Sequence, residues 1–311
     1  MTKVFIDGSA GTTGLRIYDR LRERRDLTLI TLADAVRKDP AARADALHQA
    51  DVAFLCLPDA AAMEAVALLD GDESTVVIDT STAHRTADGW AYGLPELSGQ
   101  REKIRQSARI ANPGCHASGF VALAAPLVQH GLIAKDALLS CFSLTGYSGG
   151  GKKMIAEYED EARDVLLGAP RMYGLTQQHK HLKEMKAICQ LEQLPVFCPI
   201  VGDFYSGMEV VIPLHAAQLN GTISDVRELY RSVYAGGVIH FAEAADENGF
   251  LSASAMAGRD DMQITVHGNE ERILLTARFD NLGKGASGAA VQNMNIALGV
   301  EETTGLELGG N

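Results

Sequence analysis

The chain has 311 residues, of which 46% are hydrophobic and 22% are charged. This composition is that of a folded globular protein and the length suffices for two domains, which excludes a mainly disordered chain. The 40 acidic and 28 basic residues give a formal net charge of −12, which argues against nucleic acid as a partner because phosphate backbones require a basic face.

The N-terminal residues 1–7 contain too short an apolar run for a signal peptide, and no stretch has the ~20 apolar residues that cross a bilayer. The cysteines are odd in number and form no CxxC pair: Cys56, Cys115, Cys141, Cys189 and Cys198. We therefore expect a cytoplasmic protein with no membrane segment and no metal site.

The N-terminal part of the chain alternates between strand and helix patterns. Apolar runs predict strands at 3–6, 27–32, 51–57 and 75–79, and helical patterns lie at 15–21, 41–50 and 60–69. Near-continuous apolar strands separated by helices indicate a parallel sheet that is covered on both faces.

The pattern changes after about residue 115. Segments with a period of two follow at 137–143, 208–214, 262–267 and 272–279, and a helix rich in small residues is predicted at 285–298. The period of two predicts a mixed or antiparallel sheet. Since no flexible linker separates the two parts, we expect a tight junction, which is a common place for an active site.

A glycine-rich loop lies between the first predicted strand and the first predicted helix. Its glycines leave room for a phosphate to approach the backbone, and the helix N-terminus offers free N–H groups. The spacing differs from GxGxxG, but the context favours a dinucleotide site over a plain turn. The residues assigned to cofactor binding are Gly8, Ser9, Gly11, Thr12, Thr13 and Gly14.

Charged residues after the second predicted strand bear on the choice of dinucleotide. Asp34 is placed to bind a ribose 2′-hydroxyl, which favours NAD. Arg37 and Lys38 follow and are suited to a 2′-phosphate, unless they are only a solvated charge pair. We interpret the pair as a preference for NADP.

Cys115 differs from the other cysteines in its local sequence. Pro113 and Gly114 make a turn that exposes it at the start of a predicted helix, where the helix N-terminus stabilises a thiolate. A thiolate is the nucleophile that acyl transfer needs. The other four cysteines lie in apolar surroundings and are predicted to be structural.

Two histidines open a predicted helix at 179–185. His181 and Glu184 are three residues apart and share a face, so that the carboxylate can orient the imidazole for acid/base work. His179 is expected to point elsewhere on the helix, which makes His181 the predicted acid/base and His179 the alternative. A pair of surface histidines on a basic helix is the competing interpretation.

Two further loops are suited to anions. Residues 146–153 form a second glycine-rich loop between a strand and a helix, with two lysines at its end. Residues 79–85 follow the fourth strand, and Arg85 can bind a carboxylate or phosphate with two hydrogen bonds. Each loop could also be a plain turn.

The segment 110–119, Ile-Ala-Asn-Pro-Gly-Cys-His-Ala-Ser-Gly, resembles the shorter form of the N-acetyl-γ-glutamyl-phosphate reductases, which are related to aspartate-semialdehyde dehydrogenases. Matching pieces follow in order along nearly the whole chain at 8–14, 79–85, 92–96, 146–151, 179–185 and 280–288. His116 and Ser118 replace an aromatic residue and a threonine of the family, and Lys183 replaces a proline.

The resemblance implies an α/β fold with two domains. Residues 1–114 and 286–311 would form a Rossmann-type, NADP-binding parallel-sheet domain, and 115–285 an inserted α+β catalytic and dimerisation domain. It also implies a homodimer or homotetramer. Asn281 and the turn at 283–288 would lie near the nicotinamide, and we assign Asn281, Ser148 and Gly149 to the cofactor site.

The activity implied is the NADPH-dependent reduction of N-acetyl-L-glutamyl 5-phosphate to the 5-semialdehyde in arginine biosynthesis, through a thioester on Cys115. The residues assigned to the phosphate or carboxylate of this acyl-phosphate substrate are Ser81, Arg85, Asn112 and Gly150. The alternatives are an aspartate-semialdehyde dehydrogenase, which usually has Asn where this chain has Gly114, and a dinucleotide-sensing protein without catalysis.

Overall fold

A computed structural model describes residues 1–309, which divide into two compact units. The first consists of Met1–Gly114 and Ala286–Leu306, and the second of Cys115–Gly285 with the described residues from Glu307 on. Glu307 belongs to the second unit because it accepts a hydrogen bond from the backbone N–H of Asp260 (2.7 Å) and donates one to the Asp260 carboxylate (2.8 Å). The C-terminal return to the first unit therefore spans Ala286–Leu306.

The first unit contains a six-stranded sheet whose strand pairs are all parallel, in the order β2-β1-β3-β4-β6-β5. The strands are β1 (Thr2–Asp7), β2 (Leu27–Ile30), β3 (Val52–Leu55), β4 (Val76–Asp79), β5 (Ala91–Tyr92) and β6 (Arg109–Ala111). The helices are α1 (Thr12–Leu21), α2 (Pro40–Gln49), α3 (Asp59–Ala67), α4 (Gln100–Gln106) and α9 (Gly288–Ala297).

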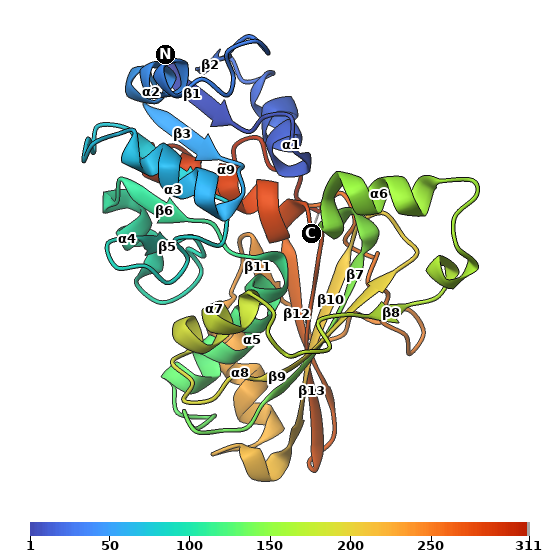
Figure 1. Ribbon diagram of the computed structural model, residues 1–311. Helices are drawn as coiled ribbons and strands as arrows, with labels where there is room; N and C mark the ends of the chain where they lie inside the picture. The colour runs from blue at the N-terminus through green and yellow to red at the C-terminus, as the bar shows by residue number, and fades with distance from the viewer. Residues whose placement is uncertain (310–311) are drawn as a thin grey trace. The chain divides into compact units, whose positions relative to one another are not determined.

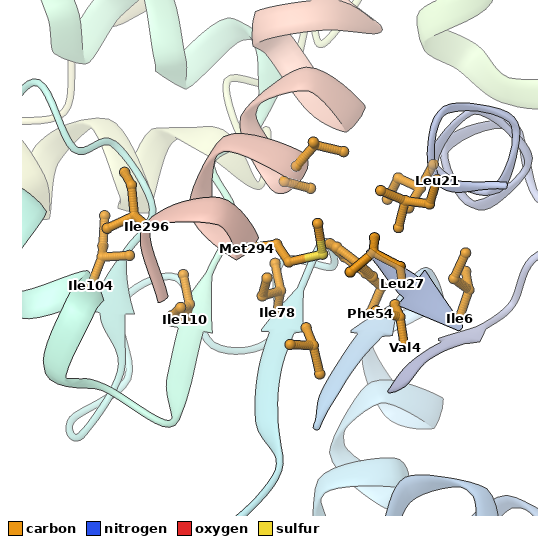
Figure 2. Packing of buried hydrophobic residues seen from close by; sticks show 14 of the residues in the cluster. Val4, Ile6, Leu21, Leu27, Phe54, Ile78, Ile104, Ile110, Met294 and Ile296 are labelled. Atoms are coloured by element: carbon orange, nitrogen blue, oxygen red, sulfur yellow. The ribbon is translucent and has the colours of Figure 1, made fainter. Parts of the chain in front are cut away.

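Helices cover both faces of this sheet, which confirms the predicted arrangement. On one face, α1, α4 and α9 pack on alternate strand residues, and Figure 2 shows Met294 of α9 close to Ile78 and Phe54. On the other face, Leu47 of α2 packs with Phe5 and other residues of the second cluster. The central strand β3, Val-Ala-Phe-Leu, is apolar throughout because both of its faces are buried.

The first and last helices of this unit differ in detail from the prediction. The helix predicted at 15–21 begins earlier, at Thr12; its buried face is formed by Ile17 and Leu21, and Leu15 is 48% exposed. A short segment of π-helix, Gly283–Ser287, precedes α9, so that the regular α-helix begins later than predicted.

The second unit contains a mixed seven-stranded sheet in the order β11-β12-β13-β10-β7-β9-β8, as the period of two predicts. Its strands are β7 (Ser140–Gly146), β8 (Arg171–Met172), β9 (Val196–Gly202), β10 (Met208–His215), β11 (Ile239–Phe241), β12 (Met262–Gly268) and β13 (Arg272–Phe279). Its helices are α5 (Cys115–Gln129), α6 (Gly151–Glu159), α7 (His181–Cys189) and α8 (Ile223–Val233), with short 3₁₀ turns at Tyr147–Gly150, Val165–Gly168 and Ala216–Gln218.

Helix α5 is buried along nearly its whole length, between the sheet on one side and helices α7 and α8 (Figure 1). From Gly119 to Val128 its sequence is entirely apolar, as in a helix with no solvent face. Pro126 lies inside the helix and has no N–H for the carbonyl of Ala122. The hydroxyl of Tyr234 donates to that carbonyl instead (2.6 Å), so the helix that begins at Cys115 keeps its backbone bonded.

Among residues 1–309, no helix combines the length and the hydrophobicity that a membrane-spanning segment needs.

Candidate active site

The glycine-rich loop of the first unit has a backbone that other residues would not fit. Gly8 has a φ of +86°, and a Cβ there would lie 2.3 Å from the carbonyl oxygen of Cys56. A Cβ on Gly14 would lie 2.5 Å from the carbonyl oxygen of Gly8. The N–H of Gly11 donates to that same oxygen (3.0 Å), and α1 begins directly afterwards. The loop therefore turns sharply from β1 into a helix N-terminus, as a phosphate cradle requires.

A pocket of about 380 Å³ lies beside this loop. It brings Gly8 together with the charged side chains of Asp34, Arg37 and Lys38. The Arg37 Nε and an Asp34 carboxylate oxygen are 3.5 Å apart, and both side chains are well exposed. The rest of the lining comes from β1, α1, β2 and the loops after them: Phe5, Ile6, Asp7, Ser9, Ala10, Leu15, Tyr18, Leu29, Ile30, Thr31, Leu32 and Leu57.

A buried ion pair at the base of this loop was not predicted. Asp7 ends β1 immediately before Gly8, and its carboxylate accepts hydrogen bonds from Nε (2.9 Å) and Nη2 (2.8 Å) of Arg43. Both side chains are at most 10% exposed. Arg43 belongs to α2, so the pair ties that helix to the start of the glycine loop. The two residues are far apart in the sequence, and no local pattern links them.

The loop after β4 is organised around Asp79, which is fully buried. Its carboxylate accepts hydrogen bonds from the backbone N–H (2.8 Å) and the hydroxyl (2.7 Å) of Ser81, and lies 2.6 Å from Nδ1 of His84. The His84 ring stacks on Trp90. These contacts hold the Asp79–Arg85 loop, with its predicted substrate residues, in one conformation.

Asn112 connects this loop to the C-terminal helix. Its carbonyl oxygen accepts a hydrogen bond from Nε of Arg85 (3.0 Å), and its side chain accepts one from Nδ2 of Asn293 (3.1 Å). Its own Nδ2 donates to the carbonyl of Ala286 (3.0 Å). The structure thus brings the predicted substrate residues Arg85 and Asn112 together within the first unit, whereas Gly150 belongs to the second unit.

In the second unit, Cys115 is the first residue of α5 and is partly exposed. Burial raises the pKa of Cys56 to about 12, and it also raises the pKa values of the fully buried thiols of Cys141 and Cys189. Those thiols therefore stay protonated near neutral pH, as expected of structural cysteines. Cys115 alone stands at a helix N-terminus.

His179 and His181 lie side by side, with ring centroids 4.7 Å apart. The prediction that His179 points elsewhere on a helix is wrong, because α7 begins at His181 and His179 lies in the turn before it. The backbone N–H of His181 donates to Nδ1 of His179 (3.3 Å). Glu184 lies in the first turn of α7, where the helix dipole favours a carboxylate, and both it and His181 are buried.

His116, directly after Cys115, joins this cluster. Its ring centroid lies 5.8 Å from that of His179, 5.5 Å from that of His181 and 5.3 Å from that of Phe197. Burial, together with the charge of His179, lowers the pKa of His116 to about 3, so the imidazole is neutral. No role was predicted for His116, which stood out only as a departure from the family. Its position next to Cys115 was the signal that could have identified it.

The second glycine-rich loop follows β7 in the same unit. The Nδ2 of Asn281 donates to the hydroxyl of Ser148 (3.0 Å), and its Oδ1 accepts from the N–H of Gly207 (2.9 Å). A Cβ on Gly149 would lie 3.4 Å from that same Nδ2. The structure therefore brings together Ser148, Gly149 and Asn281, the three residues of this unit that were assigned to the cofactor.

Comparison with known proteins agrees with this architecture. Residues 115–281 match a family profile described as "Semialdehyde dehydrogenase, dimerisation domain", and residues 29–107 match one described as "Semialdehyde dehydrogenase, NAD binding domain". The first match covers more than half of the chain. The chain belongs to the semialdehyde dehydrogenase family.

Curated relatives narrow this assignment. The N-acetyl-gamma-glutamyl-phosphate reductase of Brucella anthropi is 47% identical over 306 residues, covering 96% of this chain and 98% of its own. The N-acetyl-gamma-glutamyl-phosphate reductase of Brucella ovis is 46% identical, and the match covers 96% of this chain and 99% of the relative. Within the family, the chain is therefore a member of the N-acetyl-gamma-glutamyl-phosphate reductases.

Solved structures show the same fold. Aspartate semialdehyde dehydrogenase II from Vibrio cholerae superposes with a TM-score of 0.70 at 16% identity, covering 96% of this chain and 98% of its own. The aspartate semialdehyde dehydrogenase from Francisella tularensis also has a TM-score of 0.70, at 15% identity, covering 95% and 99%.

Proposed function

We propose that this protein reduces N-acetyl-L-glutamyl 5-phosphate with NADPH to N-acetyl-L-glutamate 5-semialdehyde and phosphate, a step of arginine biosynthesis. The observation that carries the proposal is the setting of Cys115, which is partly exposed at a helix N-terminus and lies in the unit that also holds His179 and His181. A chain with this nucleophile, an NAD-binding domain and full-length similarity to such reductases is suited to this chemistry.

In the proposed reaction, the Cys115 thiolate attacks the acyl carbon, the carbon–phosphate oxygen bond breaks, and phosphate leaves. The enzyme then holds the acyl group as a thioester, which divides one difficult reduction into two easier steps. When bound, NADPH supplies a hydride to the thioester carbon. The resulting tetrahedral alkoxide expels the Cys115 thiolate and becomes the aldehyde.

His181 is the proposed acid/base and His179 the alternative. His181 would take the proton of the Cys115 thiol before attack and so keep the sulfur nucleophilic. Glu184, one helical turn along α7, would favour the protonated imidazole. The neutral His116 next to these rings cannot serve as the base near neutral pH, since its pKa is about 3.

We assign NADP as the preferred dinucleotide. The close approaches at Gly8 and Gly14 fit a phosphate cradle, since a Cβ at either position would fill the space beside the backbone. Arg37 and Lys38 line the pocket next to this cradle and are suited to a 2′-phosphate. Residues Ser9, Gly11, Thr12 and Thr13 complete the cradle. Ser148, Gly149 and Asn281 would hold the cofactor from the second unit.

The substrate's phosphate or carboxylate is assigned to Ser81, Arg85, Asn112 and Gly150. Arg85 supports this assignment because it is held by the carbonyls of Asn112 (3.0 Å) and Thr80 (3.1 Å), which fix a guanidinium group beside the segment that leads to Cys115. Such a fixed guanidinium binds carboxylate or phosphate with little loss of side-chain entropy.

The proposed domain roles follow the two units: cofactor binding in the first, and catalysis and dimerisation in the second. We also propose a homodimer or homotetramer that is assembled through the sheet face opposite α5. Three large apolar side chains of that face are 43–56% exposed: Phe142, Val196 and Leu274.

All five cysteines are free thiols, which supports a cytoplasmic location. Small molecules and a second copy, rather than nucleic acid or membrane, are the proposed partners.

The test is the reverse reaction: phosphate-dependent reduction of NADP⁺ by the purified protein with N-acetylglutamate semialdehyde. Aspartate semialdehyde is the comparison substrate. Turnover that requires phosphate and prefers the acetylated substrate supports the proposal. A preference for aspartate semialdehyde would make the protein an aspartate-semialdehyde dehydrogenase. Dinucleotide binding with no turnover, and with Cys115 unreactive toward iodoacetamide, would indicate a sensor.

A further inference from the structure

A chain of three hydrogen-bonded side chains lies beside the nucleophile. His116 of α5 is at its centre, with Nδ1 2.6 Å from the hydroxyl of Ser143 and Nε2 2.6 Å from the hydroxyl of Tyr173. Ser143 belongs to β7, and Tyr173 directly follows β8. These hydrogen bonds thus link the first turn of α5 to β7 and to the residue that follows β8.

The direction of these hydrogen bonds follows from Ser143. Its side chain is fully buried, and within residues 1–309 His116 is the only hydrogen-bond partner of its hydroxyl. A buried hydroxyl without an acceptor is costly, so Ser143 donates to Nδ1 of His116. The imidazole is neutral and has a single N–H, which must then be on Nε2. That N–H donates to the oxygen of Tyr173.

Tyr173 is therefore an acceptor toward His116 and keeps its own hydroxyl hydrogen for another group. Its ring packs against His179, with centroids 6.0 Å apart. Burial raises the pKa of Tyr173, and the charge of Cys115 raises it further, so the hydroxyl stays protonated and lies within electrostatic reach of the sulfur. Within the described residues, its hydroxyl has no side-chain hydrogen-bond partner other than His116.

We propose that Tyr173 is a catalytic residue whose hydroxyl, oriented by Ser143 and His116, donates a hydrogen bond to the acyl oxygen of the substrate on Cys115. As the sulfur–carbon bond forms, the carbon–oxygen π electrons move to this oxygen, and the hydroxyl stabilises the negative charge. Tyr173 keeps its proton throughout, so no further reactant is needed. The inference rests on the proposed reductase function.

The first test replaces Tyr173 by phenylalanine, which keeps the ring and removes the donor. Losing one such donor costs about 10²–10³-fold in kcat. We expect a loss of that size for Tyr173→Phe, with KM changed little and with the rate of Cys115 alkylation by iodoacetamide near that of the wild type. Tyr158→Phe is the matched control, since Tyr158 packs in the same apolar cluster and its hydroxyl accepts from Arg171 (3.0 Å). A Tyr173→Phe enzyme with kcat within about threefold of the wild type overturns the inference.

The second test addresses the orienting role of Ser143. Ser143→Ala leaves Nδ1 without its donor and frees the ring to adopt either tautomer, so kcat should fall although Tyr173 is present. Ser143→Thr keeps a hydroxyl and should restore most of the activity. Equal kcat for the Ala and Thr variants would contradict the orienting role.

The tautomer of His116 gives a readout that needs no activity. In protein labelled with ¹⁵N-histidine, nitrogen NMR at neutral pH should show His116 with its hydrogen on Nε2. A hydrogen on Nδ1 would reverse the direction of the hydrogen bonds of His116 and overturn the inference even in an active enzyme. If the wild-type protein has no reductase turnover, both the proposed function and the inference are overturned. If the wild type is active and Tyr173→Phe is unimpaired, only the inference is overturned.

Discussion

Cys115 is chemically the same side chain as Cys141, yet the fold gives the two thiols different environments. Cys141 is fully buried in β7, where desolvation opposes ionisation. Cys115 begins a fifteen-residue helix and remains partly exposed. The helix N-terminus favours the thiolate and exposure admits a substrate.

Replacing the sulfur tests this assignment directly. Cys115→Ser should unfold at nearly the same temperature as the wild type but lose several orders of magnitude in turnover, because a serine hydroxyl is not ionised there. Reductase rates and thermal unfolding provide the measurement. Cys198→Ser, in a partly exposed strand, is the control and should keep its activity. If Cys115→Ser keeps more than about a tenth of the rate, catalysis is not covalent.

The adjacent histidines differ in their surroundings. His179 uses Nδ1 to accept from the backbone of His181, while His181 is the buried first residue of α7. We expect His181→Ala to lose 10²-fold or more in kcat, on the scale of about 10²–10⁴ for an acid/base, and His179→Ala to lose clearly less. Measuring kcat and KM for both variants decides between them. The reverse order would identify His179 as the base.

The neutral, buried His116 should make stability depend on pH. Its pKa is about 3 in the folded protein and 6.5 when unfolded, so the unfolded chain binds the extra proton between these values. Stability is therefore fully present above pH 6.5 and is lost as the pH falls toward 3, by at most about 1.4 kcal/mol per pH unit. Urea unfolding at several pH values should show a shallower slope for His116→Phe. An unchanged slope would mean that His116 does not titrate in this range.

At the scale of elements, the two glycine-rich loops show how a strand, a turn and a helix build a binding surface. In the first loop, the positive φ of Gly8 and the close approach at Gly14 bend the chain from β1 into α1. In the second, the N–H of Gly146 donates to the carbonyl of Gly207 (3.0 Å), which brings the loop against the start of β10. Both loops lie at the carboxyl ends of strands, and in the parallel sheet of the first unit this is where ligands bind.

The segment after β2 should decide the cofactor preference. In the double variant Arg37→Ser with Lys38→Ser, the positive charges that face the pocket are lost. We expect the KM for NADPH to rise at least about tenfold, since each interaction with a charged group contributes roughly 1.5–3 kcal/mol, while the KM for NADH stays nearly unchanged. Steady-state rates with both cofactors are the measurement. An equal rise of the KM for NADH would mean that Arg37 and Lys38 do not bind the 2′-phosphate.

The sequence of helix α5 leaves one of its backbone hydrogen bonds without a donor, because Pro126 lies inside the helix. Pro126 would be expected to interrupt the helix, because the carbonyl of Ala122 loses its donor. The helix continues because Tyr234, which directly follows α8, donates to that carbonyl, while Tyr230 of α8 donates to the carbonyl of Leu123 (2.5 Å). Packing of a distant helix thus compensates for a local defect.

In the folded protein, one face of the seven-stranded sheet is packed by α5, and the opposite face leaves large apolar side chains exposed. Strand residues alternate between the face that α5 covers, such as Val210, and the opposite face, which includes Phe142 and Leu274. Apolar residues on the uncovered face are typical of a surface that another subunit covers.

The variant Phe142→Glu with Leu274→Glu tests this surface. Placing two charges on the face should dissociate the proposed oligomer, because burial of unpaired carboxylates costs several kcal/mol. Light scattering coupled to size exclusion should show half the mass of the wild type or less. Met63→Glu, on α3 of the first unit, is the control and should leave the mass unchanged. A double variant with the wild-type mass would place the interface elsewhere.

Features that depend on neighbours along the chain can be predicted from the amino-acid sequence alone. The strands β1 to β4, the turn at Gly8–Gly14, and the position of Cys115 at the start of a helix follow from periodicity and turn chemistry, which act over a few residues. Contacts between distant segments become visible only in the folded protein. Asp7 with Arg43, His116 with Tyr173, and Ser148 with Asn281 are 36, 57 and 133 residues apart. Such pairs depend on how whole elements pack, and no local pattern encodes that packing.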